Sequence, residues 1–346
     1  MDSLGKICVL GGGTWGTALA KIVLMNNDHL HWYIRRTEQI EGFYKLGHNP
    51  DYLTNLKFNL AQITFYSSIE RAIKDSDTII LAFPSPYVKQ YLKRIWNSAF
   101  KGKFVISAIK GIVPNDNMVI SEYLAYNFRI PLENIGVLSG PCHAEEIALE
   151  RLSFLTSACI DTEKATMLAE AINSRIMHTR VSNDVVGIEM ASVLKNIYAI
   201  AAGICQGLQY GDNFQAVLMT NCAKEMERFL SSVAPMERNI CEQHYLGDML
   251  VTGYSQFSRN RTLGTMIGKG YSVKTAQLEM EMIAEGYYGA KCIMEMNQRF
   301  KIDIPIVNTV YQILYDKLPP KAGIQKLIEE STPKSRKDNL VDNISG

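Results

Sequence analysis

The glycine-rich segment near the start of the chain constrains the fold most. Residues 11–16 read Gly-Gly-Gly-Thr-Trp-Gly and match a GxGxxG pattern at Gly11, Gly13 and Gly16. A β-rich run, residues 6–10, precedes the pattern, and a helical pattern follows it. Gly11 permits a tight turn, Gly13 lets the backbone approach a pyrophosphate, and Gly16 lets helix and strand pack closely. In this position the pattern favours dinucleotide binding over a glycine turn with a purely structural role.

Apolar runs that resemble buried strands recur through the first half of the chain. After the first run they lie at residues 31–34, 78–82, 103–107 and 134–138. Such runs are typical of parallel strands covered on both faces, as in an open doubly wound sheet. From about Gly187 onward the strand signals fade and helix formers dominate. The sequence therefore predicts an α/β chain with a doubly wound Rossmann-type domain over residues 1–186, an all-α domain over 187–330 and a flexible tail over 331–346.

Composition and charge exclude several classes of protein. The 346 residues hold 36 Lys and Arg against 35 Asp and Glu, so no global field draws the chain to nucleic acid or anionic lipid. Seven scattered cysteines without a CxxC pair argue against a disulfide framework and a metal site. The most apolar helical stretch, residues 191–208, contains Lys195 and Asn196, which argues against a membrane span. Because no signal-peptide pattern opens the sequence, we expect a cytoplasmic protein.

Two arginines follow the second predicted strand. A site specific for NAD commonly places Asp or Glu there, but this chain has Arg35 and Arg36 before Glu38. Arginines suit the 2′-phosphate of NADP and can stack on adenine. The alternative is an exposed basic strand end. We expect the chain at least to tolerate NADPH beside NADH.

Two lysines occupy positions that suit chemistry at the cofactor. Lys110 follows the strand at residues 103–107, and the loop at 139–144 follows the strand at 134–138, where doubly wound sheets bind ligands. Lys195 lies within an apolar helix, where burial and a neighbouring cation would lower its pKa and make it a proton-transfer group. Its aliphatic stem could instead pack while its ammonium group reaches solvent.

A later segment joins an acid to a cluster of hydroxyl, guanidinium and amide groups. Residues 247–252 include Asp248 and Thr252, and Ser258-Arg259-Asn260 is typical of a helix N-terminus, a natural phosphate site. Asp248 could orient Lys195 or a substrate hydroxyl, or it could cap a helix.

With these residues in view, the chain resembles the NAD(P)-dependent sn-glycerol-3-phosphate dehydrogenases over about residues 6–318. The resemblance rests, in this order, on GGGTWGTALA, KGI, LSGPCHAEE, LKNIYAIAAGICQGLQYGDN, GDMLVT, SRNR and AEG. It implies an enzyme that interconverts dihydroxyacetone phosphate and sn-glycerol 3-phosphate by hydride transfer with NAD or NADP. It also implies a homodimer that supplies the backbone of phospholipids.

The resemblance also implies roles for individual residues. Lys195 would be the general acid/base, with Lys110 and Asp248 around the reacting centre. Motif and resemblance together give these cofactor positions: Gly11, Gly13, Thr14, Trp15, Gly16, Arg35, Arg36, Lys110, Ala144, Arg259, Ile283 and Glu285. They give these substrate positions: Lys110, Gly140, Cys142, Lys195, Asp248, Thr252, Ser258, Arg259 and Asn260. Cys142-His143 departs from the family's usual small hydroxyl residue followed by an aromatic one.

Two other functions stay open on the sequence. A dehydrogenase of the same plan acting on another hydroxy acid would keep the glycine turn and Lys195 but need not keep Ser258-Arg259-Asn260. A non-catalytic dinucleotide sensor would keep the glycine turn while losing Lys195 or Asp248, whereas this chain keeps both.

Overall fold

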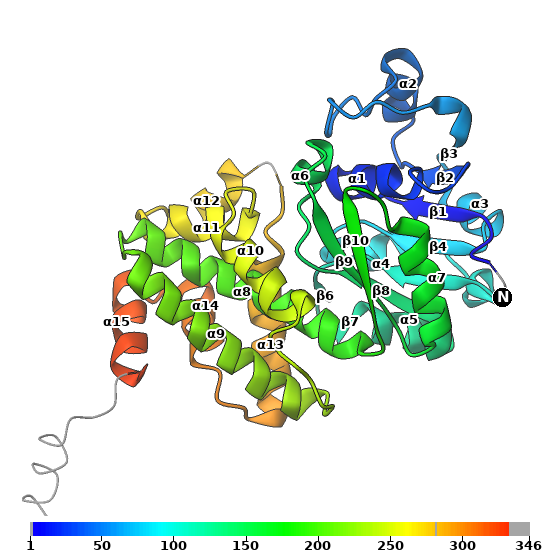
Figure 1. The fold of residues 1–346 in the computed structure, drawn as a ribbon. Helices are drawn as coiled ribbons and strands as arrows, with labels where there is room; N and C mark the ends of the chain where they lie inside the picture. The colour runs from blue at the N-terminus through cyan, green and yellow to red at the C-terminus, as the bar shows by residue number, and fades with distance from the viewer. Residues whose placement is uncertain (1–2, 281, 332–346) are drawn as a thin grey trace, which may run out of the picture.

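The chain forms a sheet-containing half and a helical half that lie side by side (Figure 1). The computed structural model describes residues 3–280 and 282–331. The last strand of the sheet ends at Ser182 and the first helix of the second half begins at Val185, next to the predicted domain boundary. The predicted flexible tail lies outside the described residues from position 332 onward.

Eight strands form the sheet of the first half. In spatial order they run β10-β9-β8-β5-β4-β1-β2-β3. Their bounds are β1 (Ile7–Leu10), β2 (Leu30–Tyr33), β3 (Ile63–Tyr66), β4 (Thr78–Leu81), β5 (Phe104–Ser107), β8 (Ile135–Ser139), β9 (Ser153–Cys159) and β10 (Met177–Ser182). A separate two-stranded ribbon pairs β6 (Ile112–Val113) with β7 (Met118–Val119).

Helices cover both faces of this sheet. They are α1 (Thr14–Val23), α2 (Thr37–Leu46), α3 (Ile69–Lys74), α4 (Val88–Leu92), α5 (Ile120–Phe128), α6 (Ala144–Ala148) and α7 (Thr162–Ile172). Alternate residues of β1 enter two separate cores: Val9 joins the core that α1 and α7 cover, and Leu10 joins the core that α3 and α5 cover. Burial on both faces confirms the predicted doubly wound arrangement and explains why these strands are continuously apolar.

The five strands predicted from apolar runs are present as β1, β2, β4, β5 and β8. The sequence did not predict β3, β9 and β10, and β9 pairs with β8 in the antiparallel direction. The five predicted strands pair with one another in the parallel direction, as expected for a doubly wound sheet. The sequence missed β9 and β10 because β9 reads SFLTSAC and β10 reads MHTRVS, so hydroxyl, basic and small residues interrupt the apolar run.

The helical half is built around α8 (Val185–Gly207), whose residues are almost all buried. Around it lie α9 (Asp212–Val233), α10 (Asp248–Tyr254), α11 (Arg259–Gly268), α12 (Val273–Glu279), α13 (Glu285–Phe300), α14 (Pro305–Tyr315), α15 (Pro320–Ser331) and the π-helical turn η5 (Gln243–Gly247). Within the described ranges α8 is the one helix long and apolar enough to cross a bilayer, and 94% of its most apolar window is buried inside the protein. It serves as the core helix of this half.

Helix α11 packs unusually close to α8 because glycines line the contact. A Cβ atom at Gly264 would lie 2.1 Å from the Ile200 carbonyl oxygen, and one at Gly203 would lie 2.1 Å from the Arg261 carbonyl oxygen. A larger side chain at either position would push the helices apart. This close approach brings the first residues of α11 beside the middle of α8, where Lys195 lies.

Candidate active site

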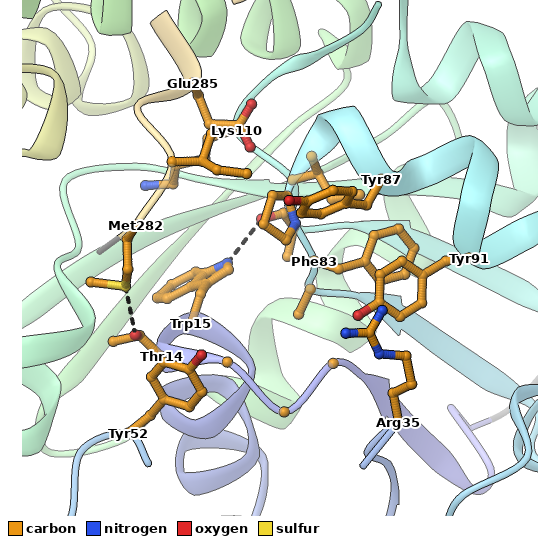
Figure 2. Close-up of a pocket in the computed structure, with 18 of the residues that line it drawn as sticks. Thr14, Trp15, Arg35, Tyr52, Phe83, Tyr87, Tyr91, Lys110, Met282 and Glu285 are labelled. Atoms are coloured by element: carbon orange, nitrogen blue, oxygen red, sulfur yellow. Dashed lines mark hydrogen bonds between the residues drawn. The ribbon is translucent and has the colours of Figure 1, made fainter. Parts of the chain in front are cut away.

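A cavity of about 560 Å³ opens at the carboxyl edge of the sheet, above the glycine turn. Figure 2 shows side chains from both halves of the chain around it. Its lining includes most of the predicted cofactor positions: Gly11, Gly13, Thr14, Trp15, Arg35, Arg36, Lys110, Arg259, Ile283 and Glu285. Ala144 lies instead on the wall of a smaller, neighbouring cavity.

The glycine turn fits a dinucleotide at this cavity. A Cβ atom at Gly13 would meet nothing within 4 Å, whereas one at Gly11 would lie 2.3 Å from the Ala82 carbonyl oxygen. Gly11 has a φ of +137°, which side chains other than glycine rarely adopt. Helix α1 starts at Thr14 without a side-chain cap, so its first N–H groups face the open space beside Gly13. This arrangement suits a pyrophosphate, which helix N-termini bind through N–H groups and the helix dipole.

Gly16 does not line the cavity. A Cβ atom there would lie 2.1 Å from the Gly11 carbonyl oxygen, so this position must stay small for α1 to pack against the turn. Its contribution to cofactor binding is therefore to hold the shape of the turn.

Several aromatic side chains line the cavity, and of these the sequence analysis predicted Trp15 alone. Phe83 and Tyr91 stack with ring centroids 4.5 Å apart, and Trp15 donates a hydrogen bond from Nε1 to the Ala108 carbonyl oxygen at 2.8 Å (Figure 2). Tyr87 lies beside Phe83 and Tyr91, whereas Tyr52 lines the cavity beside Thr14 (Figure 2). Phe83 could have been predicted, since it follows β4 at the carboxyl edge of the sheet. Tyr52, Tyr87 and Tyr91 lie in loops and a short helix where no sequence pattern marks them.

The two predicted arginines lie in different surroundings. The Arg35 guanidinium lies 5.6 Å from the centroid of the Tyr91 ring and faces the cavity (Figure 2). Arg36 forms an exposed ion pair with Asp51. Because Arg35 has no carboxylate within ion-pairing distance among the described residues, it is the better placed of the two to meet a 2′-phosphate.

Arg35→Ala should weaken NADPH binding more than NADH binding. Loss of a charge-assisted contact to the 2′-phosphate would raise the Kd for NADPH about tenfold, while the Kd for NADH would change about twofold. Titration of both reduced cofactors against the quenching of tryptophan fluorescence measures this ratio. Arg36→Ala is the matched control, and equal losses for both cofactors in Arg35→Ala would exclude contact with the 2′-phosphate.

Glu285 connects the two halves beside this cavity. As the first residue of α13, it accepts hydrogen bonds from the backbone N–H and the hydroxyl of Ser85, which follows β4. Burial raises the pKa of Glu285, and the two hydrogen bonds from Ser85 oppose the rise. The cavity is therefore closed on one side by a contact between residues 200 positions apart.

A second cavity of about 150 Å³ adjoins the first. The two share the lining residues Trp15, Lys110, Arg259, Ile283 and Glu285. The smaller one is also lined by predicted substrate positions: Cys142, Lys195, Asp248, Thr252, Ser258 and Asn260. A small ligand held there would lie against a nicotinamide held in the larger cavity.

A buried ion pair lies at the floor of the smaller cavity. Lys195 of α8 and Asp248 of α10 form it, with 3% and 1% of their side chains exposed. Lys110 places its ammonium nitrogen 3.6 Å from the same carboxylate and donates a hydrogen bond to the Gly140 carbonyl oxygen at 2.8 Å. The structure thus brings together the three predicted catalytic residues, which lie far apart in sequence. Gly140 contributes its carbonyl oxygen to this cluster instead of lining the cavity.

The charges of this cluster set its proton affinity. Burial lowers the pKa of Lys195 to about 7, Asp248 opposes that shift, and Lys110 adds to it. Burial alone would raise the pKa of Asp248, but Lys110 and Lys195 outweigh it, so that the carboxyl pKa lies below its usual value. Asp248 is therefore ionised, and Lys195 can exchange a proton near neutral pH.

A chain of asparagine side chains holds the cluster in place. Asn196 donates a hydrogen bond to the Lys110 carbonyl oxygen at 2.8 Å, and Asn260 donates one to the Asn196 side-chain oxygen at 2.9 Å. The Gly286 N–H donates to the Asn260 side-chain oxygen at 2.9 Å. The three helices α8, α11 and α13 are thereby fixed to the strand end that carries Lys110. Asn196 was not predicted as a site residue, although it follows Lys195 directly.

Arg259 is a cation without a paired carboxylate at the start of α11. No acidic side chain of the described residues lies within ion-pairing distance of it, although Glu145 and Glu285 are close enough to favour its charge. Burial lowers the pKa of Arg259, yet a guanidinium stays protonated in proteins. Ser258 caps the same helix by accepting a hydrogen bond from the Arg261 N–H at 3.3 Å. A helix N-terminus with a free guanidinium is suited to bind a phosphate.

Cys142 and Thr252 have more limited chemistry. Burial raises the pKa of the Cys142 thiol to about 12, so this side chain is a neutral part of the wall. The Thr252 hydroxyl donates a hydrogen bond to the Asp248 carbonyl oxygen at 2.6 Å, one turn earlier in α10.

Comparison with known proteins gives consistent matches along the chain. A family model described as the N-terminus of NAD-dependent glycerol-3-phosphate dehydrogenase matches residues 6–165, and the model of the C-terminus matches residues 184–325. A glycerol-3-phosphate dehydrogenase, NAD(P)+, from Clostridium botulinum (strain Eklund 17B / Type B) is 32% identical over 325 residues, which are 94% of this chain and 97% of the relative. The protein of the same name from Bacillus subtilis (strain 168) is 30% identical, covering 93% and 94%.

The fold also matches solved structures. The crystal structure of glycerol-3-phosphate dehydrogenase from Coxiella burnetii superposes with a TM-score of 0.86 at 26% identity, covering 94% of this chain and 99% of that one. The similarity therefore extends through both halves of the molecule.

Proposed function

Since this chain belongs to the NAD-dependent glycerol-3-phosphate dehydrogenase family, we propose that it reduces dihydroxyacetone phosphate to sn-glycerol 3-phosphate with Lys195 as the proton donor. The enzyme is an oxidoreductase that uses NAD or NADP, and the reaction is reversible. The observation that carries the proposed mechanism is the buried pair of Lys195 and Asp248 at the floor of the smaller cavity.

Proton transfer is the task of the lysine. When bound, the reduced nicotinamide supplies the hydride that the substrate carbon accepts. Negative charge then develops on the ketone oxygen, and the Lys195 ammonium group stabilises that charge and donates its proton. In the reverse direction neutral Lys195 accepts the proton of the substrate hydroxyl. A pKa near neutrality supports both roles, because neither protonation state is then rare.

Asp248 and Lys110 position the proton donor. The Asp248 carboxylate holds the Lys195 ammonium group by their ion pair and offsets part of the cost of burying it. Lys110 adds a second positive charge at 3.6 Å from that carboxylate, and this charge favours an oxyanion in the same cavity. The asparagine chain fixes the backbone of Lys110 and so limits reorganisation during the reaction.

Arg259 and the N-terminus of α11 would hold the phosphate. Both are close to Lys195 because glycines let α11 approach α8. A fixed phosphate aligns the ketone with the proton donor, so binding energy remote from the reaction contributes to the rate.

The proposed proton transfer predicts opposite pH profiles for the two directions. Reduction requires protonated Lys195, so its kcat/KM should be highest below pH about 7 and fall as pH rises through that value. Oxidation of sn-glycerol 3-phosphate requires neutral Lys195, so its kcat/KM should rise over the same range and then level off. Initial rates at 340 nm between pH about 5 and 9 measure both profiles.

Asp248→Asn provides the control for this assignment. Removing the carboxylate removes the charge that opposes the drop in the Lys195 pKa, so both inflections should move to lower pH. Profiles that are flat in both directions, or that do not move in Asp248→Asn, would exclude Lys195 as the titrating group.

We also propose that the enzyme works in the cytoplasm. Seven free cysteines, six of them buried, support a reducing compartment such as the cytoplasm.

The product has the glycerol backbone of phospholipids, which supports a role in supplying their synthesis. Resemblance to the family supports a homodimer, and sedimentation equilibrium of the full chain would give the oligomeric state.

A further inference from the structure

His143 lines the smaller cavity, and the proposed mechanism leaves its chemistry unused. It lies between β8 and α6, directly after Cys142, and faces the cavity that holds Lys195 and Asp248. Its Nε2 atom is buried and has no hydrogen-bond partner among the described residues. Buried nitrogen atoms in native proteins nearly always have a partner, because an unsatisfied one is costly. The partner of Nε2 is therefore expected to be a ligand group in this cavity.

The imidazole is neutral at physiological pH. Burial, together with the positive charges of Lys110 and Lys195, lowers the pKa of His143 to about 4, and the Asp248 charge opposes this shift. A hydrogen bond with the Val251 backbone favours the charged ring but does not outweigh these effects. Because the Val251 backbone accepts the one N–H of the neutral ring, the Nε2 atom is a hydrogen-bond acceptor, and it matches a hydroxyl group, which can donate.

The other polar groups of the substrate already have partners in the proposed function, on which this inference rests. The phosphate is assigned to Arg259 and the ketone oxygen to Lys195. A phosphate beside His143 would favour a charged imidazole, whereas the two lysines disfavour it. The remaining group is the hydroxyl at the unphosphorylated end of dihydroxyacetone phosphate. This hydroxyl is attached to the carbon next to the ketone, and His143 lies close to the charged cluster that handles the ketone.

We propose that His143 determines substrate specificity, with its Nε2 atom hydrogen-bonded to the free hydroxyl of dihydroxyacetone phosphate. The ring of Phe257, with its centroid 6.1 Å from that of the imidazole, limits the directions in which His143 can turn. The chain thereby selects a ketone that carries a hydroxyl on the carbon opposite the phosphate.

The test compares two substrates in four forms of the protein: the wild type and three variants. Hydroxyacetone phosphate has a methyl group where dihydroxyacetone phosphate has the hydroxymethyl group, so it lacks only the free hydroxyl. The wild-type protein should favour dihydroxyacetone phosphate by about tenfold in kcat/KM. His143→Phe keeps an aromatic ring but removes the nitrogen, so it should lower kcat/KM for dihydroxyacetone phosphate three- to tenfold, roughly, mainly through KM. The same variant should change hydroxyacetone phosphate by about twofold or less.

Two further variants separate this role from a structural one. His143→Gln can place an amide group near the position of Nε2 and should restore most of the preference for the hydroxyl. His178→Phe, on the exposed part of β10, controls for the loss of a histidine elsewhere and should leave both substrates unchanged. Melting temperatures within a few degrees of wild type would show that each variant is folded.

The results distinguish an error in the assignment of His143 from an error in the proposed function. Equal losses for both substrates in His143→Phe, or no loss for either, would overturn the assignment of His143. Failure of the wild-type protein to reduce dihydroxyacetone phosphate would instead overturn the proposed function, and the assignment of His143 with it.

Discussion

Lys195→Ala is expected to lower kcat for the reduction of dihydroxyacetone phosphate by about 10² to 10⁴. The variant removes the only ammonium group of the described residues that is both buried at the cavity floor and directly paired with Asp248. The hydride donor stays in place, but the developing oxyanion loses its proton source and part of its electrostatic stabilisation. The Kd for NADH should stay within about threefold of wild type, since Lys195 does not line the larger cavity.

Removing Lys195 also leaves the Asp248 carboxylate without its main partner, which can destabilise the fold. Lys195→Met retains the length of the side chain and tests whether the loss is chemical or structural. Lys291→Ala, on the exposed face of α13, is the matched control for removal of a lysine. A folded Lys195→Met variant with kcat within about tenfold of wild type would reject the role in proton transfer.

Arg259→Ala is expected to raise the KM for dihydroxyacetone phosphate by about 10- to 100-fold, with a smaller effect on kcat. The guanidinium is partly buried and unpaired, so a phosphate bound to it would gain charge-assisted hydrogen bonds that water does not replace. Arg259→Ala should have little effect on the reduction of dihydroxyacetone, which has no phosphate. The low rate of that reaction should change about twofold or less.

Arg261→Ala is the control for this variant. Arg261 lies on the same turn of α11 but lines neither cavity, so its removal should leave the KM nearly unchanged. Arg259 also lines the larger cavity, so the KM for NADH must be measured in parallel. Equal losses for dihydroxyacetone phosphate and dihydroxyacetone would show that Arg259 serves the cofactor and not the phosphate.

Sequence reasoning succeeded where one residue type has few structural alternatives. Continuous short apolar runs predicted five central strands because such runs, bounded by turn residues, are typical of strands buried on both faces. The glycine pattern predicted the turn because Gly11 must adopt a positive φ and Gly16 must allow contact with the turn. Lys195 stood out because a lysine in an apolar helix needs a partner, and the structure supplies Asp248.

Residues whose role depends on tertiary contacts could not be identified from the sequence. Tyr52 lies in a loop and Tyr91 in a short helix, and both line the cavity only when the fold is assembled. Asn196 forms a hydrogen-bonded chain with Asn260 and Lys110, although nothing in its local sequence distinguishes it from a surface amide. The antiparallel edge of the sheet was missed because β9 is buried without being continuously apolar. In each case the role of the residue or strand depends on which distant part of the chain it contacts, and the local sequence does not reveal that contact.

The proposed reduction of dihydroxyacetone phosphate is tested most directly by mixing this ketone with the purified full chain and reduced cofactor. The absorbance of the reduced cofactor at 340 nm then reports its oxidation. The assay should be run in parallel with NADH and NADPH, with dihydroxyacetone as the control that lacks the phosphate. We predict loss of absorbance that depends on the phosphorylated ketone and produces sn-glycerol 3-phosphate in equal amount. Binding of NADH or NADPH without oxidation at any concentration of dihydroxyacetone phosphate would contradict the account.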